Sequence, residues 1–316
     1  MTMTIRSLAG SVLLAGAVLA CSPSGPAPSP ATPAVSLPAT SAPARTPEPT
    51  TLVATPQPDE EPATATPTLA PPSQAPVSST TVRAYFMLGS FAGTASVTPV
   101  LRAVPETTAV AAAAMQALLN GPQGAELEAS PAMYTGIPEG TRLLGLAIED
   151  KVAVVTLSKE WEKTRATFQT GSATTQVVFT LTQFPTVKQV RIRVEGGPIG
   201  PEISRVALQE MGLVPAIFVD RPAWGAAARN PLKLAGSANV FEATFRAQLL
   251  DADGAVLADE QVTASCGTGC WGHFKADIPY AVPKPQYGTL RVFSLSALDG
   301  TPKNVVEYSV WLTPAE

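Results

Sequence analysis

Histidine and cysteine are scarce in this chain of 316 residues, which holds one histidine, His273, and three cysteines. Two cysteines and one histidine leave a structural zinc site one ligand short. The sequence also lacks a Gly-x-Ser-x-Gly motif, a phosphate-binding glycine-rich loop and a pair of histidines at helical spacing. We therefore expect no catalytic residues, no metal site and no cofactor, and we expect His273 to lie on the surface of a strand.

Charge is sparse as well. Only 15% of the residues are charged, the formal net charge is -4, and the lysines and arginines form no cluster. Proteins that bind nucleic acid carry a basic patch or stripe. The sequence therefore predicts no nucleic-acid partner and no electrostatic binding to a membrane surface.

A short apolar run at residues 8–20 follows Arg6 near the N-terminus. As a helix the run spans about 20 Å, less than the roughly 30 Å of a bilayer's hydrocarbon core, so residues 1–20 are predicted to be a signal peptide. The run ends in Val-Leu-Ala before Cys21, which resembles a bacterial lipobox. That resemblance implies cleavage before Cys21 and a diacylglycerol on its sulfur. The alternative is an ordinary signal peptide followed by an incidental cysteine.

Residues 21–80 comprise the predicted lipidated Cys21 and a linker that holds half of the chain's 32 prolines and no aromatic residue. Such a composition buries too little apolar surface to offset the entropy of ordering. We expect a disordered, Pro/Ala/Thr-rich tether that holds the folded part outside the cytoplasmic membrane, anchored through the lipid on Cys21.

Residues 81–198 are predicted to form an α+β domain. We expect strands at 81–87, 100–104, 143–148, 152–157 and 187–194, and a helix at 106–119. Thr107 is the candidate N-cap of that helix, and Gly121 and Pro122 end it. Segment 174–184 has strand propensity, but its apolar residues also fit helical spacing with Ser172 as a cap.

Five segments of this domain, in order and spacing, resemble the GerMN domain of sporulation and germination proteins. They are 119–122 (Leu-Asn-Gly-Pro), 137–141 (Ile-Pro-Glu-Gly-Thr), 154–158 (Val-Val-Thr-Leu-Ser), 180–185 (Thr-Leu-Thr-Gln-Phe-Pro) and 187–196. The resemblance implies a compact α/β fold and makes segment 174–184 a helix. It brings no catalytic residues.

Residues 215–316 follow a linker at 199–214 and are predicted to form an all-β, immunoglobulin-like sandwich. Seven strands are expected, at 216–219, 232–235, 241–249, 255–265, 271–278, 290–295 and 305–312. Residues 230–243, with the Asp-Gly turns at 253–254 and 299–300, resemble the immunoglobulin-like Gmad domain of spore germination proteins. We expect the two domains to fold independently.

Cys266 and Cys270 enclose Gly-Thr-Gly in a predicted loop between strands. Because lipid would occupy Cys21, these two form the remaining even pair, and we predict a structural disulfide. A redox-active pair is the alternative, although its spacing is not that of thioredoxin-like motifs.

Together these features predict a non-enzymatic lipoprotein of the cell envelope that acts as an interaction or assembly module with a protein partner. The alternative is an extracytoplasmic module that binds peptidoglycan or a peptide. An enzyme acting on glycans through paired carboxylates is the weaker alternative, since Asp150, Glu160 and Glu162 are expected to be solvated surface charges. Candidates for a docking face are Trp224, Trp271 and Trp311, although the sequence favours core packing for each of them.

Overall fold

The computed structural model describes residues 78–89, 96–166 and 170–315. The predicted signal peptide, Cys21 and nearly all of the predicted tether therefore lie outside the described residues. No helix among the described residues is long and apolar enough to cross a membrane.

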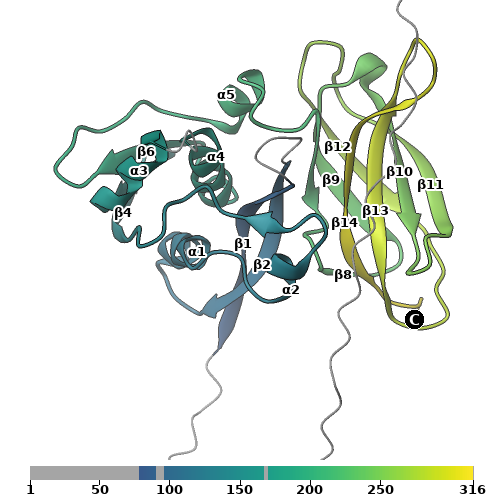
Figure 1. The fold of residues 1–316 in the computed structure, drawn as a ribbon, viewed down its shortest axis with the longest axis horizontal. Helices are drawn as coiled ribbons and strands as arrows, with labels where there is room; N and C mark the ends of the chain where they lie inside the picture. Colours follow the sequence, from purple (N-terminus) through teal and green to yellow (C-terminus); the bar gives the residue numbers. More distant parts are fainter. Residues whose placement is uncertain (1–77, 90–95, 167–169, 316) are drawn as a thin grey trace, which may run out of the picture. The chain divides into compact units, whose positions relative to one another are not determined.

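The first domain contains two three-stranded sheets, ordered β2-β1-β3 and β4-β5-β6, with helices packed against them (Figure 1). Its strands are β1 (Ser79–Leu88), β2 (Ser96–Pro105), β3 (Met133–Tyr134), β4 (Leu143–Glu149), β5 (Val152–Leu157) and β6 (Gln189–Val194). Its helices are α1 (Val110–Leu119), α2 (Ala125–Glu128), the 3-10 helix η1 (Lys159–Glu162), α3 (Lys163–Ala166) and α4 (Thr170–Leu181). The α+β architecture predicted for this part of the chain is confirmed.

Strand β1 is the buried centre of the first sheet. It pairs antiparallel with β2 along its whole length, but β3 pairs only with Met87 and Leu88 on its other edge. Side chains from the α4 segment bind the remainder of that edge: Gln183 accepts from the Arg83 amide at 2.8 Å, and Gln176 donates to the Tyr85 carbonyl at 3.0 Å. Because a buried strand edge without partners is costly, these contacts complete the sheet.

Helix α4 settles the ambiguous segment 174–184 in favour of the helix that the resemblance implied. Its polar residues Gln176 and Thr180, with Gln183 just beyond the helix, recur at spacings of four and three and so share one helical face. Two details differ from the prediction. Helix α4 begins at Thr170, so Ser172 is not its cap, and α1 begins at Val110, where Ala109 rather than Thr107 is the N-cap.

The second domain is a sandwich of a five-stranded sheet, ordered β11-β10-β13-β14-β8, and a three-stranded sheet, ordered β12-β9-β7. Its elements are β7 (Ile217–Arg221), β8 (Ala227–Ala228), β9 (Leu232–Ala238), the 3-10 turn η2 (Phe241–Ala243), β10 (Thr244–Leu250), β11 (Val256–Thr263), β12 (Gly272–Ile278), β13 (Gln286–Leu295) and β14 (Pro302–Leu312). All seven predicted strands are present, and the immunoglobulin-like sandwich is confirmed.

The prediction fails at the start of β10. The strand was expected to begin at Phe241, but residues 241–243 form η2, and Glu242 and Ala243 adopt positive φ values of 53° and 59°. The alternation therefore begins only at Phe245, which is buried, while the Phe241 side chain is 55% exposed. The alternation of apolar residues continues through this turn, so the predicted strand was too long at its start.

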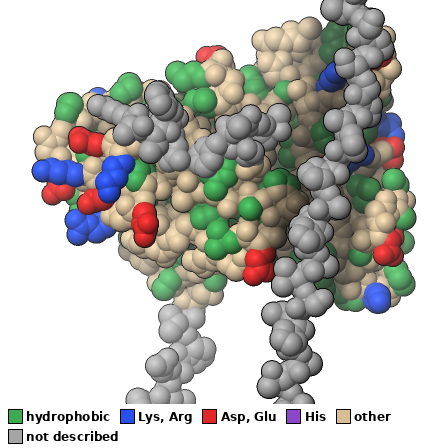
Figure 2. All heavy atoms as spheres, viewed as in Figure 1, with side chains coloured by type: hydrophobic (Ala, Val, Ile, Leu, Met, Phe, Trp, Pro, Cys, Tyr) green, Lys and Arg blue, Asp and Glu red, His purple; other side chains and the backbone are tan. Residues whose placement is uncertain are grey.

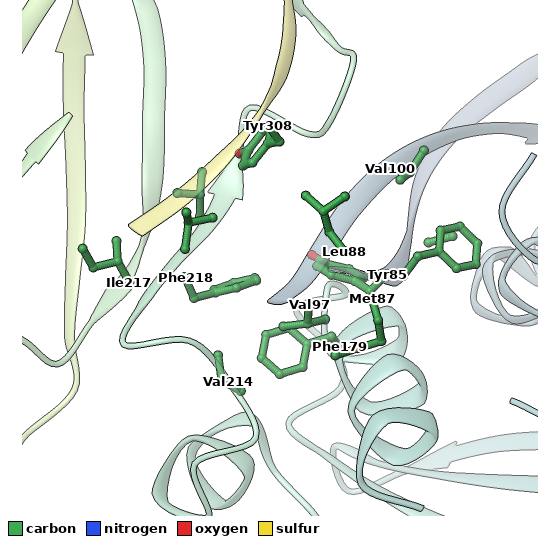
Figure 3. Close-up of a cluster of buried hydrophobic side chains, with 14 of the residues drawn as sticks. Tyr85, Met87, Leu88, Val97, Val100, Phe179, Val214, Ile217, Phe218 and Tyr308 are labelled. Carbon is green, nitrogen blue, oxygen red and sulfur yellow. The ribbon is translucent and has the colours of Figure 1, made fainter. Parts of the chain in front are cut away.

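The apolar core is continuous from one domain to the other. A single cluster includes Tyr85 and Phe179 of the first domain, Phe218 of β7, and Leu208 and Val214 of the predicted linker (Figure 3). That linker contains α5 (Arg205–Glu210). The shared core argues against the independent folding expected from the sequence, while the domain boundaries at 198 and 215 stay predictions.

Candidate functional site

Arg205, at the start of α5, links the two domains. Ser204 caps the helix by accepting a hydrogen bond from the Ala207 amide at 3.1 Å, which fixes the first turn. The guanidinium of Arg205 donates to the Thr182 hydroxyl at 2.7 Å and to the Phe179 carbonyl at 2.9 Å. It also pairs with Asp220 of β7 at 3.4 Å. One side chain thus connects α4, α5 and β7.

Aromatic rings surround this guanidinium. The Arg205 carbon Cζ lies 4.4 Å from the centre of the Phe179 ring and 5.3 Å from that of Tyr85. The rings of Phe179 and Phe218 pack edge to face at 4.9 Å, and Figure 3 shows Phe218 reaching toward Tyr85 and Phe179. Such cation–π contacts gain strength when water is excluded, so the cluster stabilises the contact between the domains.

Tyr85 completes the network by donating its hydroxyl proton to Asp220 at 2.6 Å. Burial raises the pKa of the Tyr85 phenol well above its ordinary value of 10.0, and Asp220 raises it further while Arg205 opposes the change. The phenol is therefore a permanent hydrogen-bond donor at neutral pH. The arrangement of Tyr85, Asp220 and Arg205 holds the two domains together.

A groove of about 380 Å³ adjoins this network, on the face of the β12-β9-β7 sheet next to α5. Its lining includes Ala235, Gly236 and Ser237 of the central strand β9 and Val206 of α5. The groove is also lined by basic side chains: Arg205, Arg221, His273 and Lys275. Helix α5 is fixed beside it because Gln209 donates to the Ser237 hydroxyl at 2.8 Å.

A second cleft, of about 320 Å³, has the opposite chemistry. Three of its lining residues are aromatic and two are acidic: Trp224, Tyr287 and Tyr308, with Glu128 and Glu307. Tyr287 is 57% exposed and packs edge to face against Trp311 at 4.8 Å. Tyr308 is buried and donates to the Pro222 carbonyl at 2.6 Å. Trp224 thus lines the cleft and also packs against the core, Trp311 lies beside the cleft against Tyr287, and Trp271 packs against the core.

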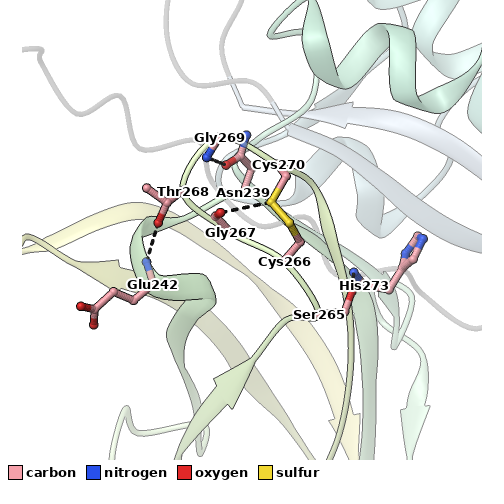
Figure 4. The surroundings of a disulfide bond; sticks show 9 residues. All are labelled: Asn239, Glu242, Ser265, Cys266, Gly267, Thr268, Gly269, Cys270 and His273. Atoms are coloured by element: carbon pink, nitrogen blue, oxygen red, sulfur yellow. Dashed lines mark hydrogen bonds between the residues drawn. A yellow bond between two sulfur atoms is a disulfide. The ribbon is translucent and has the colours of Figure 1, made fainter.

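The predicted disulfide between Cys266 and Cys270 is present, with the two Cα atoms 5.8 Å apart. Hydrogen bonds join its loop to η2 and to the residue Asn239 that precedes η2 (Figure 4): Thr268 accepts from the Glu242 amide at 2.9 Å, and the Gly269 amide donates to Asn239 at 3.0 Å. The disulfide therefore constrains the loop between β11 and β12, which is also held by these hydrogen bonds.

The other predicted residues are dispersed. His273 is exposed on β12 between buried neighbours, as predicted. Asp150 occupies the β4–β5 turn and Glu162 is exposed on η1, whereas Glu160 is half-buried, with its pKa lowered chiefly by a hydrogen bond from Ser158. Within the described residues, no three His, Cys, Asp or Glu side chains gather in a group that could hold a metal ion.

Acidic and basic side chains are interspersed on the face shown in Figure 2.

The residues that form the joint between the domains, Arg205, Tyr85 and Asp220, were not found from the sequence. Arg205 is an ordinary charged residue in a presumed linker, and its partners lie 15 and 120 positions away. The one local signal was Ser204, a good N-cap residue before the short amphipathic stretch that forms α5.

Comparisons with known proteins assign both domains to families. Residues 83–200 match a family described as sporulation and spore germination, and residues 216–301 match one described as the immunoglobulin-like domain of bacterial spore germination. The two matches together cover well over half of the chain. No curated protein matches it.

Several solved structures are similar to part of this chain. The tandem GerMN domains of the sporulation protein GerM from Bacillus subtilis are 17% identical, with a TM-score of 0.34, over 43% of this chain and 48% of that one. The chain thus spans about half the length of that structure. A putative lipoprotein from Clostridium perfringens is 18% identical, with a TM-score of 0.28, over 42% of this chain and 93% of that one.

CopC from Methylosinus trichosporium OB3b is 20% identical, with a TM-score of 0.23, over 32% of this chain and 96% of that one. At these values no activity, ligand or partner can be transferred from the solved structures. The family matches assign the two halves directly: this chain joins a sporulation and spore germination domain to an immunoglobulin-like domain of bacterial spore germination.

Proposed function

We propose that this protein is a non-enzymatic, lipid-anchored module of the cell envelope that assembles with a protein partner outside the cytoplasmic membrane. The observation that carries the proposal is the joint at Arg205. It fixes a sporulation domain and a germination domain against each other through a shared core, so that both offer their surfaces in one orientation. Two binding faces held in a fixed orientation favour assembly, because a partner that contacts both does not have to be bound at the entropic cost of ordering one domain relative to the other.

The polar chemistry of the joint also supports a holding role. Arg205, Asp220 and Tyr85 satisfy one another and nearby backbone groups. Catalytic groups, in contrast, are commonly held with perturbed pKa values facing a cleft where substrate can reach them. The Tyr85 ring is fully buried, so it meets no substrate.

The anchor rests on the lipobox-like sequence that ends at Cys21. Metabolic labelling with a fatty-acid analogue should label the parent protein and leave a Cys21→Ser variant unlabelled. The variant should be released to the medium or remain as an uncleaved precursor. Label retained on the serine variant would contradict lipidation at this residue.

The assembly role is tested by cross-linking intact envelopes and identifying what is recovered with the protein. We expect the same protein partner from independent preparations. An Arg205→Ala variant should recover less of it if the fixed orientation of the domains matters. Recovery of glycan alone, or of nothing, would contradict the proposal.

A peptidoglycan-binding module is the second candidate, favoured by the cleft that Trp224, Tyr287 and Glu128 line. Exposed aromatic rings beside carboxylates can pack on sugar rings and accept hydrogen bonds from their hydroxyl groups. Sedimentation of the protein with purified cell-wall sacculi tests it. Binding that Tyr287→Ala abolishes and Tyr308→Phe preserves would establish this function in place of protein assembly.

A further inference from the structure

The basic residues of the groove beside α5 stand in register across three strands. Arg221 of β7 and Lys275 of β12 both lie opposite Ala235 of β9, and His273 lies opposite Ser237 in the next row. With strands about 4.8 Å apart, the backbones of Arg221 and Lys275 are separated by roughly 10 Å. Ala235 between them has only a methyl side chain, so no large side chain fills the floor of the groove.

The acidic side chains on this face already have partners. Asp220 is engaged by Arg205 and by the Tyr85 hydroxyl, and Asp277 is paired with Lys233 at 2.6 Å. Arg221 and Lys275 are exposed and form no ion pair with any described residue. Two cations without counter-charges therefore flank the groove and favour a negatively charged occupant.

The separation of the two cations defines the shape of that occupant. One carboxylate or phosphate would contact both cations only if the Arg221 and Lys275 side chains converged over Ala235, because their backbones are roughly 10 Å apart. Carboxylates at alternate positions of an extended peptide project from the same face at about 6.8 Å spacing, and their flexible side chains cover the difference. Val206 and Ala235 contribute apolar surface to the groove lining, against which the aliphatic parts of the peptide between its carboxylates can pack.

We infer that this groove binds an extended acidic segment of a protein partner, with its alternate carboxylates against Arg221 and Lys275. The assignment deepens the proposed assembly function and rests on it. It names the surface and the chemistry by which a partner is held.

The single histidine makes the test specific, because His273 lines the groove and gives the only imidazole signals in the chain. The full chain with Cys21→Ser and no histidine tag is titrated with a synthetic peptide in which glutamate and valine alternate. Proton NMR should show a saturable shift of the His273 ring signals. The same peptide with glutamine in place of glutamate should leave them unchanged.

Variants test whether the peptide contacts Arg221 and Lys275. Arg221→Gln with Lys275→Gln should weaken peptide binding about tenfold or more, as expected for the loss of two charge contacts. The matched control, Lys284→Gln with Lys303→Gln, removes two exposed lysines that are not part of the groove lining and should change affinity less than about twofold. Ala235→Glu, which places a carboxylate on the floor, should abolish binding by like-charge repulsion while leaving the thermal transition in place.

Three outcomes overturn the inference: no saturable shift with the glutamate peptide, an equal shift with the glutamine peptide, or equal weakening in both pairs of variants. A stronger response to inorganic phosphate or to muropeptides would reassign the groove to a small anion or to the cell wall. If the groove fails while envelope cross-linking still recovers a partner, only this inference is lost. If cross-linking recovers none, the proposed function itself fails.

Discussion

The two domains satisfy their buried backbone in different ways. In the second domain, long antiparallel ladders such as β13–β14 pair strand with strand, and the buried side chains are almost entirely apolar. In the first domain, one edge of β1 is completed by side chains of the α4 segment, with Gln176, Thr180 and Gln183 bonded to the backbone of Arg83 and Tyr85. Stability in the first domain therefore depends on a few buried polar residues.

That difference predicts unequal tolerance to mutation. A buried polar side chain that serves a backbone group leaves that group unsatisfied when it is removed, at about 1–3 kcal/mol for each group. A conservative change in an apolar sandwich core usually costs less than about 1.5 kcal/mol. Substitutions that test the contrast should have their largest effect where both kinds of stabilisation meet, at the joint.

Arg205→Ala is expected to have the largest effect, lowering the free energy of unfolding by about 2–4 kcal/mol. It removes the ion-pair partner of Asp220, two further hydrogen bonds and the cation over the Phe179 ring. Denaturant unfolding should show this loss in both domains together, since they share one core. Arg246→Ala, which breaks a more exposed pair with Asp259, is the control and should cost at most about 1 kcal/mol. Two separate transitions in the parent protein would contradict the shared core.

Gln176→Leu is expected to cost about 2–3 kcal/mol, although leucine adds apolar surface and favours a helix. The substitution leaves the Tyr85 carbonyl and the Gly136 amide without their partner. Gln116→Leu is the matched control on α1, where the glutamine is exposed and its side chain donates to Asn120 at 3.1 Å. An equal loss in the two variants, measured by denaturant unfolding, would contradict the dependence of the first domain on buried polar side chains that serve its backbone.

The same contrast explains how much the sequence could predict. Strands of the second domain follow apolar alternation, a local pattern, so all seven were found; the failure at Phe241 came where alternation continued through a turn. In the first domain, segment 174–184 was ambiguous because its threonines and valines favour strands. The polar stripe formed by Gln176, Thr180 and Gln183 was the missing signal, and it has meaning only once β1 lies beside the helix.

The candidate site was less predictable than the fold. Arg205 and Asp220 meet only in three dimensions, and the register that sets Arg221 and Lys275 on either side of Ala235 depends on which strands are neighbours. The disulfide was predictable because counting cysteines required no geometry. The disulfide and the periodic strands could thus be predicted from the sequence, whereas side-chain contacts between distant segments could not.

Loss of the disulfide tests the second domain by its one covalent constraint. Replacing both Cys266 and Cys270 by serine should lower the free energy of unfolding by about 2 kcal/mol in the chain-entropy description of so short a loop. Hydrogen bonds from the loop to Asn239 and Val240 persist and limit the damage. Thermal unfolding checks the magnitude, and intact mass with and without reductant checks the bond. Altered partner recovery in a stable double mutant would show that the loop has a binding role.

Alkaline pH separates the buried joint from the surface and gives the smallest effect, since none is expected near neutrality. Burial raises the folded-state pKa of Tyr85 above its ordinary value of 10.0, so the associated stability is fully present below pH 10. Above that value the unfolded phenol loses its proton while the folded one retains it, and stability falls by up to about 1.4 kcal/mol per pH unit for each such group. Tyr308, also buried with a raised pKa, adds to the slope. Tyr85→Phe should make the fall in stability, measured by denaturant unfolding between pH 9 and 11, shallower by the contribution of one phenol. An identical slope in Tyr85→Phe and the parent would mean that the phenol beside Arg205 and Asp220 is open to solvent, and the joint would then not be the dry contact on which the coupling of the domains depends.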